Sequence, residues 1–168
     1  MYKTGEIIVY SAQGVCRISG TEEKRISGNN RKYLMLKPIG DTEAVFCVPM
    51  WNETALSRLR KVMSKDELNA IIDAIPDQKS VWIGNENERK EAHRRILTSG
   101  DQAAIVSMIR SLYLHKKERE AEGKRLHIAD ENIMKEAEQL LYNEWQYVLD
   151  VDRAGLLAYI TRRIAGKD

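Results

Sequence analysis

Three histidines and two cysteines are the side chains of this 168-residue chain best suited to metal or nucleophilic chemistry. His93, His115 and His127 are too far apart in sequence to place two imidazoles on one helix face, which takes a spacing of three or four residues. Cys16 and Cys47 form no CxxC pair and have no histidine close by. The sequence therefore predicts no metal site and no cofactor.

The motifs that usually mark a reaction centre are also missing. The chain has no phosphate-binding P-loop, no nucleophile elbow and no HExxH zinc motif. The carboxylates between Asp130 and Glu144 are explained as the solvated face of a helix. We therefore predict that the protein is not an enzyme.

A tryptophan followed by basic residues has the chemistry for contact with DNA. Trp82 precedes Gly84 at a predicted loop-to-helix junction and lies outside the apolar stripes of the predicted helices. An indole can insert beside a base step while nearby cations hold phosphates. The alternative is that the ring fills the helical core, and the residue types alone favour that interpretation. Trp51 also has two interpretations: its ring could seal a contact between the two halves of the chain, or it could contact a partner.

The overall composition describes a globular protein with a net charge of +2. Residues 82–125 hold ten Lys or Arg against seven Asp or Glu, whereas 126–152 hold one against seven, so a basic surface can coexist with an acidic helix. No segment approaches the roughly 18 consecutive apolar residues of a membrane helix, and the N-terminus lacks the apolar stretch of a secretory signal. We expect a cytoplasmic protein with no membrane partner.

The first fifty residues have the pattern of short strands separated by glycines. Apolar and β-branched residues predict strands over 6–10, 15–19, 21–26, 32–37 and 44–48. The segment from Ser27 to Asn30 has the residue types of a hairpin turn. Five strands in so short a segment indicate a small, strongly bent antiparallel barrel.

From Ser64 onward the apolar period becomes helical. Ser64 and Glu67 have the spacing of a capping box, and further periodic segments run over about 86–98, 102–122, 129–149 and 152–165. The predicted fold class is α+β: a small N-terminal antiparallel barrel followed by a C-terminal bundle of about five helices. We place the first domain at residues 1–52 and the second at 53–168.

Motifs in both halves of the chain resemble the CarD/CdnL family, whose N-terminal domain is shared with the bacterial transcription-repair coupling factor. The resemblance rests, in order, on Gly5, Val9-Tyr10, Gly14-Val15, Ile18, Tyr33–Lys37, Val48-Pro49, Trp82, Arg89, Ser99–Asp101, Ile109–Tyr113 and Asp130–Glu144. The coupling factor lacks the helical half, so the CarD group is the better match.

The resemblance implies a transcription regulator, and we expect the protein to be a monomer. Its Tudor-like or SH3-like barrel would dock on the β subunit of RNA polymerase, and its helical domain would contact the minor groove and phosphate backbone of promoter DNA. In the family, a tryptophan wedges in at the upstream edge of the melted region and stabilises the open complex.

The resemblance, together with the basic residues near its motifs, gives two sets of candidate residues. The polymerase-binding set is Lys24, Arg25, Arg31, Lys32, Phe46 and Cys47. The DNA-binding set is Trp82, Arg89, Lys90, Arg94 and Arg95. Cys47 stands where the family carries a second basic residue, and about four more residues than usual separate Trp82 from Ser99. We expect charge reversal at Lys24 and Arg25 to weaken capture of the β subunit.

A protein-interaction adaptor is the alternative function. Such a protein would use its Tudor-like domain to bind a partner, and its helices would have no direct role on DNA. Exposure of Trp82 beside cations would favour the DNA-binding function, whereas burial of the ring would favour the adaptor.

Overall fold

The computed structural model describes residues 1–40 and 42–166 and divides the chain into two compact units, Met1–Met63 and Ser64–Asp168. This division lies downstream of the expected boundary after residue 52. The reason is strand β5 (Leu59–Lys61), which pairs with strand β1 and brings the segment that precedes it into the first unit.

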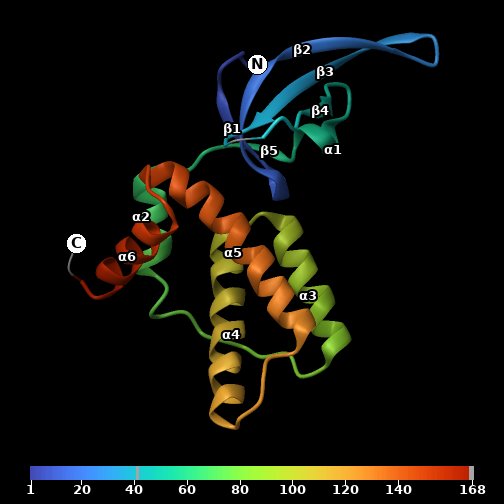
Figure 1. Ribbon diagram of the computed structural model, residues 1–168. Helices are drawn as coiled ribbons and strands as arrows, with labels where there is room; N and C mark the ends of the chain where they lie inside the picture. The colour runs from blue at the N-terminus through green and yellow to red at the C-terminus, as the bar shows by residue number, and fades with distance from the viewer. Residues whose placement is uncertain (41, 167–168) are drawn as a thin grey trace. The chain divides into compact units, whose positions relative to one another are not determined.

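The first unit is a five-stranded antiparallel sheet (Figure 1). Its other strands are β1 (Ile7–Tyr10), β2 (Gly14–Ile26), β3 (Asn29–Pro38) and β4 (Phe46–Pro49), in the order β4-β3-β2-β1-β5. A short 3-10 turn (Ser11–Gln13) follows β1, and a single helical turn, α1 (Glu53–Leu56), lies between β4 and β5.

The predicted α+β class is confirmed, with two differences in the sheet. The segments expected as two strands, 15–19 and 21–26, form the single strand β2, whose pairing with β3 shifts register between Ile18 and Gly20. The sheet is also open and is not a closed barrel, because the short strands β4 and β5 are its two edges.

The predicted hairpin turn is confirmed between β2 and β3. Ser27 and Gly28 form a two-residue connection with positive φ angles of 48° and 82°, the conformation that matches the twist of a tight antiparallel hairpin. Both strands run past the shorter strands, so the end of the hairpin extends away from the rest of the sheet (Figure 1). This projecting end carries four basic residues, Lys24, Arg25, Arg31 and Lys32.

The core of the sheet unit lies on one face of the strands. Alternate side chains of β2 and β3 point into it, among them Ile18, Leu34 and Leu36, each no more than 1% exposed. Val48 from β4 and Leu59 from β5 complete the cluster, which explains how two very short strands are held at the sheet edges.

The second unit contains the five predicted helices. They are α2 (Lys65–Asp73), α3 (Glu86–Ser99), α4 (Gln102–Ala121), α5 (Ile128–Leu149) and α6 (Arg153–Ile164). The capping box at Ser64 and Glu67 forms as predicted, with both of its hydrogen bonds present. Gly100 ends α3 in the left-handed conformation, and Asp101 caps α4 immediately afterwards.

Helices α3, α4 and α5 contact one another, and α6 contacts α2 and α5 (Figure 1). The core between them contains Leu97, Leu112, Leu141 and Trp145. Trp145 is 2% exposed, which confirms the prediction that this ring packs inside the bundle. Across the described residues, every helix is too short or too polar to cross a membrane.

Candidate functional site

Trp82 lies in the connection between α2 and α3 and is half-buried. Its ring stacks on the imidazole of His115 from α4, with the ring centroids 3.6 Å apart and the planes 15° from parallel. The guanidinium carbon of Arg89 lies over the same indole, 4.5 Å from its centroid. The indole is therefore in contact with both an aromatic ring and a cation.

Arg89 is buried, and its charge is neutralised by Asp130 from α5. Arg89 Nε donates to Asp130 Oδ1 at 2.9 Å and Nη2 donates to Oδ2 at 2.8 Å, with both side chains at most 4% exposed. Nη1 donates to the carbonyl oxygens of Ile83, at 2.9 Å, and Gly84, at 3.3 Å. Two of these hydrogen bonds form a bidentate contact between the planar guanidinium and the Asp130 carboxylate.

This arrangement bears directly on the predicted contact between Arg89 and the DNA backbone. A phosphate could reach the guanidinium only if the buried pair with Asp130 opened, which would leave a charge desolvated and without a partner. The side chain instead ties the loop after Trp82 to α3 and α5.

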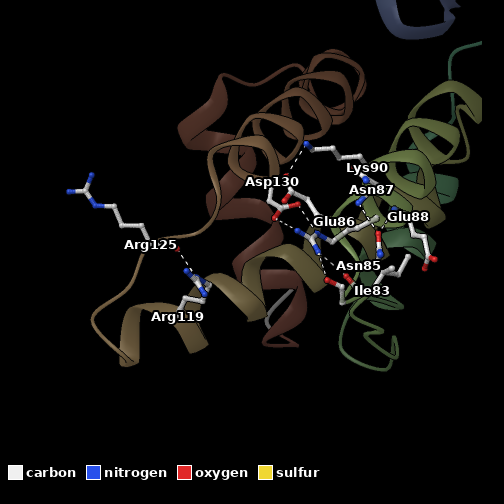
Figure 2. Close-up of polar contacts among 11 residues, drawn as sticks. Ile83, Asn85, Glu86, Asn87, Glu88, Lys90, Arg119, Arg125 and Asp130 are labelled. Carbon is white, nitrogen blue, oxygen red and sulfur yellow. Dashed lines mark hydrogen bonds and ion pairs between the residues drawn. The ribbon is translucent and has the colours of Figure 1, made fainter.

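The local sequence explains why Arg89 points inward. Asn85 caps α3 by accepting hydrogen bonds from the backbone amides of Asn87 and Glu88, which fixes the start of the helix (Figure 2). Arg89, His93 and Leu97 then recur every four residues and are the buried residues of α3. Arg89 is therefore on the core face of the helix, one turn after the cap.

Helix α4 holds the Trp82 loop from the other side. Ser111 Oγ donates to the carbonyl oxygen of Val81 at 3.0 Å, and Arg110 donates to the carbonyl oxygen of Ile75 near the start of the same connection. Because His115 stacks on the indole one helical turn after Ser111, two residues of α4 fix the loop and the ring together.

The other predicted DNA-binding residues lie on the exposed side of α3. Lys90 pairs with Glu86 at 2.9 Å, and the carboxylate of Glu86 has a pKa below its ordinary value because of the hydrogen bond and charge of Lys90 (Figure 2). Arg94 pairs with Glu136 of α5 at 3.0 Å, and Arg95 is exposed. The structure thus groups Lys90, Arg94 and Arg95 at the surface and separates them from the buried Arg89.

A small cavity of about 220 Å³ opens beside this surface. Lys90 and Arg94 line it together with the buried His93 and Asp130. Burial lowers the pKa of His93 below its ordinary value, and the charge of Arg89 acts in the same direction while that of Asp130 opposes it. His93 is therefore neutral at physiological pH, and the positive charge around the cavity comes from Lys90 and Arg94.

The predicted polymerase-binding residues divide between the two faces of the β2–β3 hairpin. Lys24 lies opposite Arg31 in the β2–β3 ladder, so these two side chains share the face away from the core. Arg25 and Lys32 are the next residues in each strand and lie on the other face.

The outward face of the hairpin continues onto β4. The ammonium group of Lys24 donates to Cys47 Sγ at 3.5 Å and lies 5.8 Å from the ring centroid of Tyr33. Cys47 lies opposite Met35, two residues from Tyr33, and is exposed. A cation thus reaches the sulfur of Cys47, although the residue itself carries no charge.

Phe46 differs from its five companions in the predicted set. Its ring lies partly buried against the sheet core and meets Tyr10 edge-on, with centroids 5.8 Å apart. This position gives Phe46 a packing role in the sheet unit.

Trp51 extends the outward face beyond β4. Its ring is 45% exposed and meets Tyr33 edge-on, at 4.9 Å between centroids. The guanidinium carbon of Arg31 lies 4.7 Å from the centroid of the indole. We call the surface formed by Lys24, Arg31, Tyr33, Cys47 and Trp51 the outer sheet face.

The two cysteines differ in environment, Cys16 being buried and Cys47 exposed. Cys16 is buried in the sheet core, and this burial raises the pKa of its thiol to about 11. Within residues 1–40 and 42–166, no group of three or more His, Cys, Asp or Glu side chains could hold a metal ion.

Sequence reasoning missed the residues that hold Trp82. Ser111, His115 and Asp130 lie 29, 33 and 48 residues after Trp82, and no local pattern links them to it. The burial of Arg89 did have a signal, namely its four-residue spacing from His93 and Leu97. Exposure of Trp82 would favour a DNA wedge and burial a core residue, and the exposure of its side chain is intermediate.

Comparison with protein-family models identifies both units. Residues 2–63 match the model described as the CarD-like/TRCF RID domain, and residues 70–161 match the model described as the CarD C-terminal domain. The first is an RNA polymerase-interacting domain, and the CarD family consists of transcription regulators that are not enzymes. The two matches follow one another along the chain and together cover nearly all of it. The chain therefore belongs to the CarD family and is an RNA polymerase-interacting transcription regulator.

Proposed function

We propose that this protein docks on the polymerase β subunit through its sheet unit and contacts promoter DNA through its helical unit. The DNA contact lies at the upstream edge of the melted region and stabilises the open complex. The observation that carries the proposal is the half-buried Trp82, held against Arg89 and His115 beside a helix with basic residues on its exposed side.

The charges around Trp82 favour weak DNA binding that depends on a second contact. The Lys90–Glu86 and Arg94–Glu136 pairs are exposed, and exposed ion pairs contribute little to stability, so a phosphate can replace the carboxylate. The same carboxylates also repel the DNA backbone. A few phosphate contacts opposed by acidic neighbours give low affinity for free DNA.

Docking on polymerase supplies the missing affinity. A protein already bound to the β subunit meets promoter DNA at an effective concentration set by its reach, on the order of millimolar for short flexible connections. A wedge in the minor groove costs a few kcal/mol of base unstacking, which contacts of this kind can offset once the protein is tethered. The division of the chain into a docking unit and a DNA unit fits this scheme.

The outer sheet face is suited to docking by charge and by backbone geometry. β4 is an edge strand, and its outward backbone groups can pair with a strand of the β subunit. Lys24 brings a positive charge to Cys47, the position where the resemblance implies a second basic residue. Lys24 and Arg31 together therefore provide the cationic character that Cys47 does not.

Permanganate footprinting of a promoter with purified polymerase tests the DNA half of the proposal. We expect the protein to prolong the lifetime of the open complex after heparin challenge, and Trp82→Ala to shorten it while capture of the β subunit is unchanged. If the open complex has the same lifetime with the intact protein as without it, the adaptor function would be favoured instead.

Charge reversal on the two faces of the hairpin tests the docking half. Lys24→Glu should weaken capture of the isolated β subunit, whereas Arg25→Glu, one residue further along β2 and on the opposite face, should weaken it less. Equal losses for both variants would indicate that the net charge of the hairpin matters more than the outer sheet face.

A further inference from the structure

We infer that Asp130 and His115 are positioning residues for Trp82, holding the indole edge-on as a preformed wedge. Asp130 acts through Arg89, and His115 acts by direct stacking. The inference rests on the proposed function and assigns roles to two residues that the DNA surface itself does not include.

The geometry of Arg89 links Asp130 to the loop that carries Trp82. Its guanidinium is planar, and two parallel hydrogen bonds to Asp130 fix the orientation of that plane. The same group bonds the carbonyl oxygens of Ile83 and Gly84, the two residues that directly follow Trp82. Asp130 therefore sets both the path of the loop and the cationic surface against which the indole lies.

Helix α4 supports the Trp82 loop independently of Asp130. His115 covers one face of the indole, and Ser111 holds the carbonyl oxygen of Val81, the residue directly before Trp82. The loop is thus bonded on both sides of the tryptophan. Three helices contribute to this arrangement: α3 through Arg89, α4 through Ser111 and His115, and α5 through Asp130.

These contacts limit which part of the Trp82 ring can meet DNA. With His115 stacked on the ring and the guanidinium of Arg89 also over it, we infer that the indole offers its edge and not a face. An edge can enter the minor groove and separate a base step, whereas stacking a base flat on the ring would require His115 or Arg89 to leave. A ring already ordered in the free protein also loses little side-chain entropy when it binds.

The experiment compares variants of the supporting residues with a matched control. Asp130→Asn keeps the shape of the side chain but removes the charge that orients Arg89. His115→Ala removes the stack, and His115→Phe restores an aromatic ring. Glu136→Gln is the control, because it removes the exposed ion pair that also joins α3 to α5.

Two readouts separate positioning from a merely structural role. The first is the ¹⁹F resonance of Trp82 in free full-length protein labelled with 5-fluorotryptophan, assigned by its loss in Trp82→Phe. The second is the lifetime of the open complex formed with polymerase. Asp130→Asn and His115→Ala should shift or broaden the resonance and shorten the lifetime several-fold, whereas His115→Phe should restore most of both and Glu136→Gln should leave the resonance in place.

Combination with Trp82→Ala completes the test. If the supporting residues act through the indole, His115→Ala shortens the lifetime no further once Trp82 is gone. An equal loss with and without Trp82, or an unmoved Trp82 resonance in both Asp130→Asn and His115→Ala, would overturn the inference. If Asp130→Asn does not fold, the two His115 variants decide the question, because His115 is only partly buried.

The inference and the proposed function fail in different ways. A Trp82→Ala variant that keeps the full lifetime refutes the role of Trp82 on DNA, whatever the supporting residues do. The resonance of the free protein still decides whether Asp130 and His115 hold the ring.

Discussion

Each unit of this protein contains a tryptophan with an arginine against its ring, and the two pairs differ in how they are held. Arg31 lies over Trp51 on an exposed strand, where the indole is 45% exposed. Arg89 lies over Trp82 but is itself 3% exposed and bonded to Asp130. The first pair can rearrange around a partner at low cost, whereas the second is fixed before any partner arrives.

The difference suits the two tasks assigned to the units. A strand edge gains most of its affinity from backbone hydrogen bonds, so nearby aromatic and basic side chains can adapt to the surface they meet. A wedge acts by its position, so an indole that moved freely would lose the advantage of entering the groove in one orientation. The comparison therefore predicts that substitutions around Trp82 affect stability and function more than equivalent ones around Trp51.

The largest expected effect is on the buried ion pair. Asp130→Ala leaves the Arg89 guanidinium buried without its carboxylate, and we expect the free energy of unfolding to fall by about 3–5 kcal/mol. Glu136→Ala, which breaks the exposed pair with Arg94 between the same two helices, should cost about 0–1 kcal/mol. Urea denaturation of both variants measures the difference, and similar losses would contradict the contrast between a fixed and an adaptable site.

The tryptophans themselves give the next largest effect. Trp82→Ala removes a ring packed between two side chains and should lower the free energy of unfolding by about 1–3 kcal/mol. Trp51→Ala should cost about 0.5–1 kcal/mol, since its ring is exposed and its cation is at the surface. Capture of the β subunit should fall only for Trp51→Ala. A loss of capture in Trp82→Ala would show that the two sites are not separate.

The stability of the site around Arg89 and Asp130 should depend on pH because His93 is buried next to both residues. His93 is buried next to Arg89 and Asp130, and its pKa lies below the ordinary 6.5, so the folded state favours the neutral imidazole. The stability due to this preference is complete above pH 6.5 and is lost as the pH falls from there toward the lowered pKa. The urea midpoint should therefore drop on acidification from about pH 7.5 to about 5.5. His93→Gln should reduce that drop, and an unchanged drop would place its cause elsewhere.

The smallest effect is chemical and needs no mutation. Cys47 lies on the outer sheet face and should react with a thiol reagent in the folded protein, whereas Cys16, with its pKa raised to about 11 by burial, should react only after unfolding. Addition of the β subunit should slow the reaction of Cys47 because docking covers that face. A reaction rate that does not change on docking would move the interface away from Cys47.

Local patterns predicted most of the fold because they act over a few residues. The capping box at Ser64 and the turn at Ser27-Gly28 depend on neighbouring residues only and formed as expected. Strand β5 was missed because three residues carry too little periodicity to show, and its place is fixed by pairing with β1, far away in the sequence.

The candidate site was predicted less well because its geometry depends on distant residues. Its basic side chain and its place shortly after Trp82 made Arg89 a predicted phosphate contact, while its partner Asp130 lies 41 residues further along and holds the guanidinium in a buried ion pair. The role of His115 arises in the same way, from the packing of α4 against the loop that carries Trp82. Contacts between residues so far apart cannot be read from a single sequence. The four-residue spacing of Arg89 from the other buried residues of α3, in contrast, does indicate that it lies on the core face.

Photocrosslinking from two positions tests the central claim most directly. A photoreactive phenylalanine analogue at position 82, in full-length protein bound to polymerase on a promoter, should crosslink to DNA at the upstream edge of the melted region. The same analogue at position 51 should crosslink to the β subunit. Crosslinks from position 82 to protein alone, in complexes where position 51 still reaches the β subunit, would contradict a DNA wedge at Trp82.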